Sequence, residues 1–178
     1  ESLPLEEVVS DPVAEVEAAG PGPHPRIPLP VSMFGSERRN SAGLNLADGR
    51  EQRSLAESCR QAMTVPLVAA PIVGGRERNG RLRKIMCPAN LERVAGEVAE
   101  ADVALVDEAL ALADSAQPKW DRRPAGERAA ILREAADRLE RDAARFIAIC
   151  VTEAGKCVPD SIAEVREAVD FLRYYAAR

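Results

Sequence analysis

The C-terminal stretch of the chain holds the residues whose types and spacing are best suited to chemistry. Glu164, Glu167, Phe171 and Tyr174 follow one another at i, i+3, i+7 and i+10, a spacing that puts all four on one face of a helix. Carboxylates next to aromatic side chains can bind the amino group of a substrate. This face is therefore the first candidate for a binding site.

The two carboxylates of this face differ in whether a structural role accounts for them. Glu164 completes the pattern Ser161-x-x-Glu164, a capping box that would satisfy two backbone amides at the start of the helix. Glu167 belongs to no such pattern. Its alternatives are a role toward a substrate or an ordinary ion pair near Arg166 or Arg173, and the spacing leaves both open.

Outside this helix, residue types that commonly catalyse reactions are scarce. The single histidine, His24, lies in the proline-rich stretch 20–30, where we expect a solvated linker rather than a catalytic or metal site. The cysteines form no Cys-x-x-Cys pair and are Cys59, Cys87, Cys150 and Cys157. This spacing favours reduced thiols in a cytoplasmic protein over a disulfide framework, a metal site or a nucleophile. We predict no catalytic residue and no metal ligand in this chain.

A basic, glycine-containing run lies between residues 74 and 84. Its glycines lack the spacing of a dinucleotide-binding or P-loop motif, and no aromatic residues are interleaved as in a nucleic-acid site. The formal charge of −5 over 178 residues also argues against nucleic-acid binding. We expect a solvated hairpin here, and no apolar run reaches the length of about 18 residues needed to span a membrane.

Hydrophobic periodicity predicts one upstream helix and a small group of strands. The helix is expected over residues 51–63. Apolar or alternating stretches predict strands that would form a small antiparallel unit, over residues 64–73, 82–86 and 94–98. Residues 40–43, Asn-Ser-Ala-Gly, have the composition of a turn.

Four further helices are predicted, each with an apolar stripe at helical spacing. Asp102 can cap the first and Pro124 can open the second. The third ends at Gly155, which suits a left-handed cap, and the fourth starts near Ser161. The stripes are, helix by helix, Val103, Val106, Leu110 and Ala113; Ile131, Leu132, Ala135 and Leu139; Phe146, Ile149 and Cys150; and Ile162, Val165, Val169 and Leu172.

Four sequence pieces, in order, resemble the opening of an aldehyde dehydrogenase. They are Cys-Pro-Ala-Asn at 87–90, Glu-Ala-Asp-Val at 100–103, Trp120 ahead of Glu-Arg-Ala-Ala-Ile-Leu at 127–132, and Glu-Ala-Gly-Lys at 153–156. The closing run, residues 162–176, is more specific. It is similar to the pyrroline-5-carboxylate dehydrogenase half of the bifunctional proline utilisation A enzymes, and residues 34–43 resemble their inter-domain connector. Cys87 departs from the asparagine that is common in the family.

The resemblance implies an α/β fold, in which this chain is the N-terminal part of an aldehyde dehydrogenase nucleotide-binding domain, mostly helices plus a small antiparallel strand unit. It implies a connector over residues 1–48 and an incomplete dehydrogenase segment over residues 49–178. The intact enzyme would oxidise glutamate semialdehyde to glutamate with NAD, after an FAD-dependent half had oxidised proline. It would be a cytoplasmic homo-oligomer, and the segment's partners would be the rest of the polypeptide and the small-molecule substrate. By the same resemblance, Glu167 would line the aldehyde pocket.

Two interpretations of the whole chain remain open. In the first it is a dehydrogenase segment that binds no cofactor and catalyses nothing by itself, because the family's catalytic cysteine and nucleotide site lie beyond residue 178. In the second it is a stand-alone helical interaction module derived from a dehydrogenase. The start without methionine and the crowding of Phe171, Leu172, Tyr174 and Tyr175 near the end favour the first.

Overall fold

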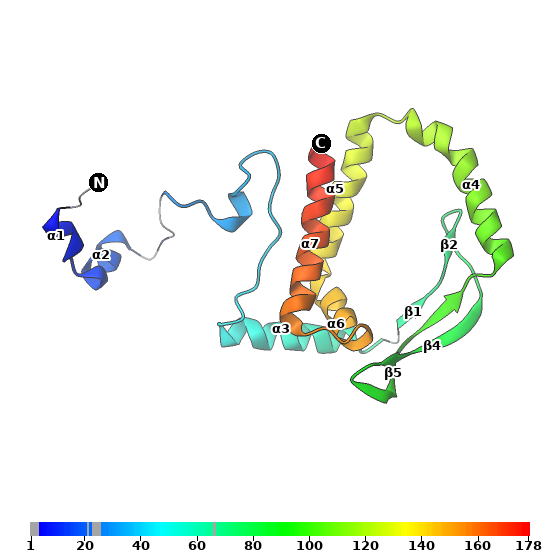
Figure 1. The fold of residues 1–178 in the computed structure, drawn as a ribbon, viewed down its shortest axis with the longest axis horizontal. Coiled ribbons are helices and arrows are strands. Elements are labelled where there is room, and N and C mark those ends of the chain that lie inside the picture. Colours follow the sequence, from blue (N-terminus) through cyan, green and yellow to red (C-terminus); the bar gives the residue numbers. More distant parts are fainter. Residues whose placement is uncertain (1–3, 21, 23–25, 66) are drawn as a thin grey trace.

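The computed structural model describes residues 4–20, 22, 26–65 and 67–178, and His24 lies outside them. Helices predominate, and the strands fall between two of them in sequence (Figure 1). The elements are α1 (Leu5–Val8), α2 (Pro12–Ala19), a 3-10 turn (Pro30–Ser32), α3 (Gly49–Ala62), β1 (Leu67–Ala69), β2 (Ile72–Val73), β3 (Arg76–Glu77), β4 (Arg81–Cys87), β5 (Asn90–Glu100), α4 (Val103–Asp121), α5 (Ala125–Arg141), α6 (Ala143–Glu153) and α7 (Val158–Ala177). The upstream helix and the four C-terminal helices confirm the prediction from periodicity.

Helices α5, α6 and α7 pack on one another, and α3 packs on α6 (Figure 1). The centre of the core is Ile147 of α6, which packs with Ile162 and Val165 of α7. Leu55 and Cys59, from the apolar face of α3, pack against this cluster. Burying these branched side chains in one cluster is the main force that holds the four helices together.

Two of the predicted stripes are only partly correct. In α6 the most buried residue is Ile147, while the predicted Phe146 is exposed. In α5 the fully buried residue is Ala136, and the predicted Ile131 is exposed. A small residue such as alanine lets two helices approach closely, so α5 and α7 make contact around side chains that hydrophobicity alone does not single out.

The strands form a mixed sheet in the order β1-β5-β4 and a separate β2-β3 pair. β4 and β5 are antiparallel, as predicted, but β1 runs parallel to β5 with Leu67 opposite Gly96. The expectation of a wholly antiparallel unit was therefore wrong. A Cβ on Gly96 would lie 2.8 Å from the Leu67 carbonyl oxygen, so the missing side chain is what lets β1 come this close.

Helix α4 begins as predicted but does not bury its stripe. The Asp102 side chain accepts a hydrogen bond from the Leu105 amide at 2.8 Å, which confirms the cap. Val103, Val106 and Leu110 are nevertheless exposed. Among the described elements α4 contacts only β2, and Figure 1 shows it standing away from α5 and α7, so the described residues leave the side with Val103, Val106 and Leu110 uncovered.

Helix α7 starts earlier than predicted, at Val158. The Ser161 hydroxyl donates to the Cys157 carbonyl at 2.8 Å inside the first turn, and the Ser161 side chain is fully buried. The capping box was therefore wrong, because a serine within a helix bonds back to the preceding turn. Glu164 instead forms an ion pair with Lys156.

Gly155 ends α6 in the left-handed conformation, with a φ of 67°. The following amide, of Lys156, donates to the Cys150 carbonyl at 3.2 Å, which closes the helix end. A Cβ on Gly155 would lie 2.9 Å from Cγ of Pro88. The turn after α6 thus packs directly against the turn between β4 and β5, so a side chain here would disturb both the backbone and this contact.

Gly155→Ala is expected to lower the free energy of unfolding by about 2 kcal/mol, because it adds left-handed strain and a clash with Pro88. Urea denaturation of the chain would measure the change. Gly126→Ala is the matched control: it lies in α5 with open space around it, and we expect it to stabilise the chain by about 0.5 kcal/mol. Two variants that shifted stability in the same direction would contradict this explanation.

Candidate functional site

The predicted face of α7 is exposed to solvent and carries the residues that the spacing placed on it. Glu164, Glu167, Phe171 and Tyr174 are all exposed. Phe171 stacks on Tyr175 with ring centroids 6.1 Å apart, and Tyr174 meets Tyr175 edge to face at 5.3 Å. The aromatic side chains therefore contact one another on the surface one to two turns beyond Glu167.

Glu167 differs from its neighbour Glu164 in its interactions. Glu164 is paired with Lys156, which joins the start of α7 to the turn before it. Within the part of the chain that the structure describes, Glu167 makes no ion pair or side-chain hydrogen bond. The ordinary ion pair considered for Glu167 is thus absent from the described residues, and its carboxylate is free to contact a ligand.

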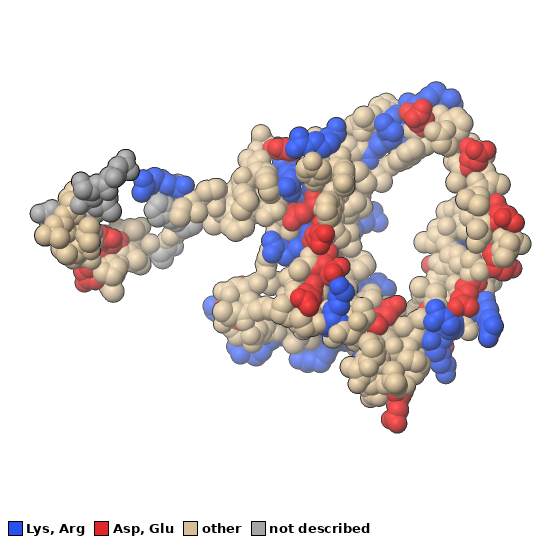
Figure 2. Space-filling view, viewed as in Figure 1, with Lys and Arg blue, Asp and Glu red and all other residues tan. Residues whose placement is uncertain are grey.

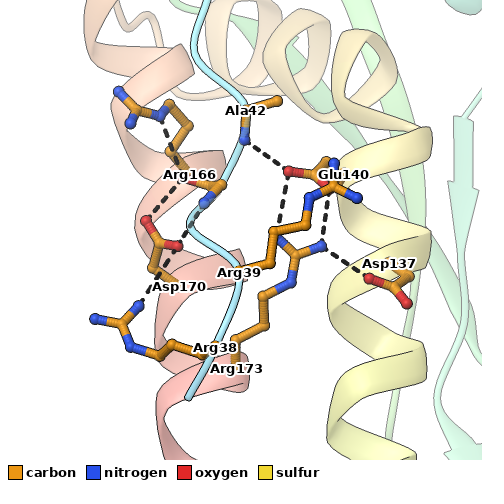
Figure 3. A network of polar contacts seen from close by, with 9 residues as sticks. Arg38, Arg39, Ala42, Asp137, Glu140, Arg166, Asp170 and Arg173 are labelled. Carbon is orange, nitrogen blue, oxygen red and sulfur yellow. Dashed lines mark hydrogen bonds and ion pairs between the residues drawn. The ribbon is translucent and has the colours of Figure 1, made fainter. Parts of the chain in front are cut away.

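A stretch without helix or strand, the connector segment (residues 38–46), runs along α7 and α5 next to this face (Figure 3). Asp170 of α7 accepts two hydrogen bonds from Ser41, one from the amide at 2.8 Å and one from the hydroxyl at 2.7 Å. The side chain of Arg166 also donates to the Ser41 hydroxyl, at 3.2 Å. Residues 40–43 form no turn, contrary to the prediction, and helix side chains accept the amides of Ser41 and Ala42.

A second acidic group, Glu140 of α5, holds the next residue of the connector segment. Its carboxylate accepts the Ala42 amide at 2.7 Å and pairs with Arg39 at 3.2 Å. Arg173 of α7 donates to both oxygens of Glu140, at 3.3 and 2.8 Å, and to Asp137 at 2.8 Å. One carboxylate thus joins the connector segment, α5 and α7 (Figure 3).

The environment of Glu140 favours its ionised form. Burial by itself would raise the pKa of this carboxyl, but the hydrogen bonds from Arg173 and Ala42 and the charges of Arg173 and Arg39 outweigh burial and lower the pKa below its ordinary value of 4.5. The hydrogen bond to Glu140 in turn raises the pKa of Arg173, against the opposing effect of burial. The pair is therefore charged at neutral pH.

The lowered pKa of Glu140 predicts a loss of stability in acid. Because the unfolded chain binds the proton more tightly, this contribution is complete above about pH 4.5 and disappears as pH falls through the folded pKa. Glu140→Gln is expected to weaken the dependence of the unfolding free energy on pH between about pH 5 and pH 3. Glu134→Gln, in an exposed pair with Arg138 on the same helix, is the control, and an equal change in both slopes would contradict the assignment.

An apolar groove of about 600 Å³ lies between α3 and α6. Its floor includes Leu55, Cys59 and Ile147, and Arg93 of β5 lies at its edge. Burial raises the pKa of the Cys59 thiol, and the thiol donates to the Ala144 carbonyl at 3.3 Å. A neutral, hydrogen-bonded thiol is a poor nucleophile, so Cys59 acts here as a small packing residue.

The turn at Gly74 and Gly75 is not a dinucleotide-binding loop. Gly74 and Gly75 have positive φ values of 63° and 75°, but they join β2 to β3, two antiparallel strands. A dinucleotide-binding loop leads from a strand into a helix, whose first amides bind the phosphates. In the part of the chain with described coordinates, no group of three His, Cys, Asp or Glu side chains is arranged to hold a metal ion.

The basic run at residues 76–84 forms β3 and part of β4, and acidic residues balance two of its arginines. Arg78 pairs with Glu108 of α4, and Arg83 with Glu100 of β5 at 2.5 Å. On the face seen in Figure 2, acidic and basic side chains are interspersed. Among the described helices, none is long and apolar enough to cross a membrane.

Comparison with known proteins places this arrangement in a family. The sequence model of the aldehyde dehydrogenase family matches residues 76–178, from β3 to the end of α7. This chain belongs to the aldehyde dehydrogenase family. The α/β fold class predicted from the sequence is thereby confirmed.

The similarity to individual proteins extends beyond the region of the family model. The chain is 43% identical to the bifunctional protein PutA of Klebsiella aerogenes over 183 aligned residues, which is 99% of this chain and 14% of that relative. It is 40% identical to a 1-pyrroline-5-carboxylate dehydrogenase of Anoxybacillus flavithermus over 60% of this chain and 21% of that relative. The predicted resemblance to proline utilisation A enzymes is therefore confirmed.

A solved structure supports the same fold. The crystal structure of 1-pyrroline-5-carboxylate dehydrogenase from Thermus with bound NAD superposes with a TM-score of 0.72 at 28% identity, covering 78% of this chain and 27% of that one. This chain therefore spans a small part of its dehydrogenase-family relatives, 14% of the length of the PutA protein above. The contacts of the connector segment were not expected from the sequence, where Ser41 and Asp170 lie 129 positions apart and Ala42 and Glu140 lie 98 positions apart.

Proposed function

We propose that this chain is part of an NAD-dependent dehydrogenase that oxidises glutamate semialdehyde, the open form of pyrroline-5-carboxylate, to glutamate in proline catabolism. The observation that carries the proposal is the similarity to PutA over 99% of the chain, at 43% identity. Matches to 1-pyrroline-5-carboxylate dehydrogenases, such as 40% identity over 60% of the chain, support the same substrate. In this proposal residues 1–48 are an inter-domain connector and residues 49–178 are the first segment of the dehydrogenase domain.

The rest of the activity is assigned to other parts of a longer polypeptide. Hydride acceptance is the chemistry that NAD supplies when bound, and an FAD-dependent half would first oxidise proline. The segment itself binds neither cofactor in this proposal, because its glycine turn at residues 74–75 joins two strands. The protein is further proposed to be cytoplasmic and homo-oligomeric, with the rest of the polypeptide as the segment's partner.

The exposed apolar side of α4 supports a segment that is incomplete by itself. Val103 is 77% exposed and Leu110 is 64% exposed, whereas a helix with such a stripe normally buries it. In the proposed enzyme, further parts of the polypeptide cover this side. The 178-residue chain alone is expected to show no NAD reduction with the semialdehyde, while the longer polypeptide should show it.

The intact mass of the natural protein tests the proposal most directly. An antibody against this segment would isolate the protein from its source, and mass spectrometry would give its size. A mass several times 19.2 kDa, with semialdehyde-dependent NAD reduction, supports the proposal. A natural mass near 19.2 kDa would overturn it in favour of the stand-alone helical interaction module.

Glu167 is proposed to contact the substrate in this enzyme. Glu167→Gln in the longer polypeptide is expected to raise KM for the semialdehyde about tenfold, because a hydrogen bond to a charged group contributes about 1.5 kcal/mol. KM for NAD should not change. Initial rates at varied semialdehyde concentration measure the effect.

Glu164→Gln is the matched control for this substitution. Glu164 lies one turn earlier on the same exposed face of α7, but its carboxylate is paired with Lys156. We expect its KM for the semialdehyde to stay within about twofold of the unsubstituted enzyme. Equal effects at the two positions would show that Glu167 acts through general surface charge and not through contact with the substrate.

A further inference from the structure

The connector segment is fastened to α7 at one buried point. Ser41 is 2% exposed, and both its amide and its hydroxyl donate to the two oxygens of Asp170, 129 residues away in the sequence. A carboxylate that accepts two such hydrogen bonds is held in both position and direction. The contact therefore fixes the rotation of α7 about its own axis relative to the connector segment.

Asp170 and Glu167 are close neighbours on the helix surface. With 3.6 residues per turn, side chains three positions apart point about 60° from each other around the axis. Arg166, which donates to the Ser41 hydroxyl at 3.2 Å, directly precedes Glu167 in the sequence. Any rotation of α7 that moved Asp170 away from Ser41 would turn the Glu167 carboxylate by the same angle.

Arg38 continues the contact toward the face that carries Glu167. Its guanidinium lies 3.6 Å from the centre of the Phe34 ring and 5.8 Å from that of Tyr174. It also lies 3.9 Å from Asp170. Arg38, which Figure 3 shows beside Asp170, thus extends the contact from Asp170 to Tyr174, the aromatic residue two turns beyond Glu167.

The apolar contacts of α7 constrain the rotation of the helix about its own axis less tightly than hydrogen bonds do. Ile162, Val165 and Val169 bury one side of the helix, but dispersion contacts are not directional. The hydrogen bonds of Asp170 are directional and lie between the buried side and the exposed Glu167 face. Together with the hydrogen bonds that Arg173 makes to Glu140 and Asp137 of α5, they distinguish one rotation of the helix from another, and of these contacts the Asp170 bonds are the ones made by the connector segment.

We propose that Ser41 and Asp170 are positioning residues for the semialdehyde site, which hold α7 so that Glu167 is directed at the substrate. In this proposal the connector segment helps to set the geometry of the dehydrogenase site and is not only a link between domains. This inference rests on the proposed function. It assigns a role to residues 38–46, upstream of the region that the aldehyde dehydrogenase family model matches.

The test measures KM for the semialdehyde in the longer polypeptide. Ser41→Ala removes the hydroxyl and keeps the amide, and it is expected to raise KM about fivefold with kcat and KM for NAD unchanged. Ser41→Thr should restore KM, since it keeps the hydroxyl and a cavity of about 130 Å³ beside Ser41 leaves room for a methyl group. Ser32→Ala, which removes an exposed hydroxyl bonded to Leu29, is the control and should have no effect.

A double substitution separates positioning from general stability. If Ser41 acts through Glu167, adding Ser41→Ala to Glu167→Gln should change KM no further. Multiplied effects of the two substitutions, or a KM for Ser41→Ala equal to that of the unsubstituted enzyme, would overturn the inference. Asp170→Asn provides a second variant that should raise the semialdehyde KM in the same way, and an unchanged KM there would also overturn it.

The same measurements distinguish failure of this inference from failure of the proposed function. If the unsubstituted polypeptide does not oxidise the semialdehyde, the proposed function is wrong and this inference falls with it. If the unsubstituted polypeptide is active and Glu167→Gln raises KM while Ser41→Ala does not, the proposed function stands and only the positioning role is excluded.

Discussion

Replacing Arg173 with alanine is expected to lower the free energy of unfolding of this chain by about 3 kcal/mol. Arg173 is 6% exposed and is the only described cation that donates to both oxygens of Glu140. Removing it leaves a half-buried carboxylate next to Asp137 without its main partner. Arg39 and the Ala42 amide still contact this carboxylate, but its charge is less well compensated in a place where water cannot fully solvate it.

Arg178→Ala is the matched control for this substitution. Arg178 also lies at the end of α7 and pairs with Glu37 at 3.1 Å, but its side chain is 60% exposed. An exposed pair contributes less than about 1 kcal/mol. Urea denaturation followed by circular dichroism would measure both variants, and equal losses would show that burial of Arg173 is not the cause.

The double variant Arg173→Ala, Glu140→Gln gives a further check on the same explanation. Removing the charge of Glu140 should recover part of the stability lost by Arg173→Ala, because the cost comes from the carboxylate that has lost Arg173. A double variant less stable than Arg173→Ala by the full effect of Glu140→Gln would mean that the two residues act independently.

Ile147→Ala is expected to lower the free energy of unfolding by a similar amount, about 3 kcal/mol. Ile147 is 2% exposed and packs with Ile162 and Val165 at the centre of the helical core. The substitution removes three carbon atoms from a site that α3, α6 and α7 share. The side chains around this site belong to packed helices and relax only in part, so the cavity term adds to the lost burial.

The control for this core substitution is Ile131→Ala in α5. Ile131 is the same residue type, also within a helix, but it is exposed. Its replacement should change stability by less than about 1 kcal/mol, partly because alanine has the higher helix propensity. Comparable losses at the two positions in urea denaturation would contradict the central place of Ile147 in the core.

Features that depend on neighbours in the sequence were predicted well. The helices α3 to α7 follow from apolar spacing, the cap at Asp102 from its side-chain oxygen, and the end of α6 at Gly155 from its freedom to adopt positive φ. The face with Glu167 also follows from spacing. Each of these is set by contacts within about one or two helical turns, so the local sequence is sufficient.

Predictions about which side of an element is buried were less successful. The stripe of α7 is buried except for Leu172, which is half-buried, but that of α4 is exposed, and Ser161 lies inside a helix rather than at its cap. Hydrophobic spacing shows which residues share a face of a helix. Whether that face is covered depends on which other elements pack there, and this is not encoded in the helix itself.

The sequence by itself determined the family resemblance, the positions of the helices and the exposed acidic and aromatic face around Glu167. Only the tertiary structure decided that β1 runs parallel to β5 and that Ser41 meets Asp170 across 129 residues. A sequence contains many serines, carboxylates and arginines that could pair. Which of them meet is decided by how the helices and strands pack, because a hydrogen bond forms only between groups that folding brings within about 3 Å.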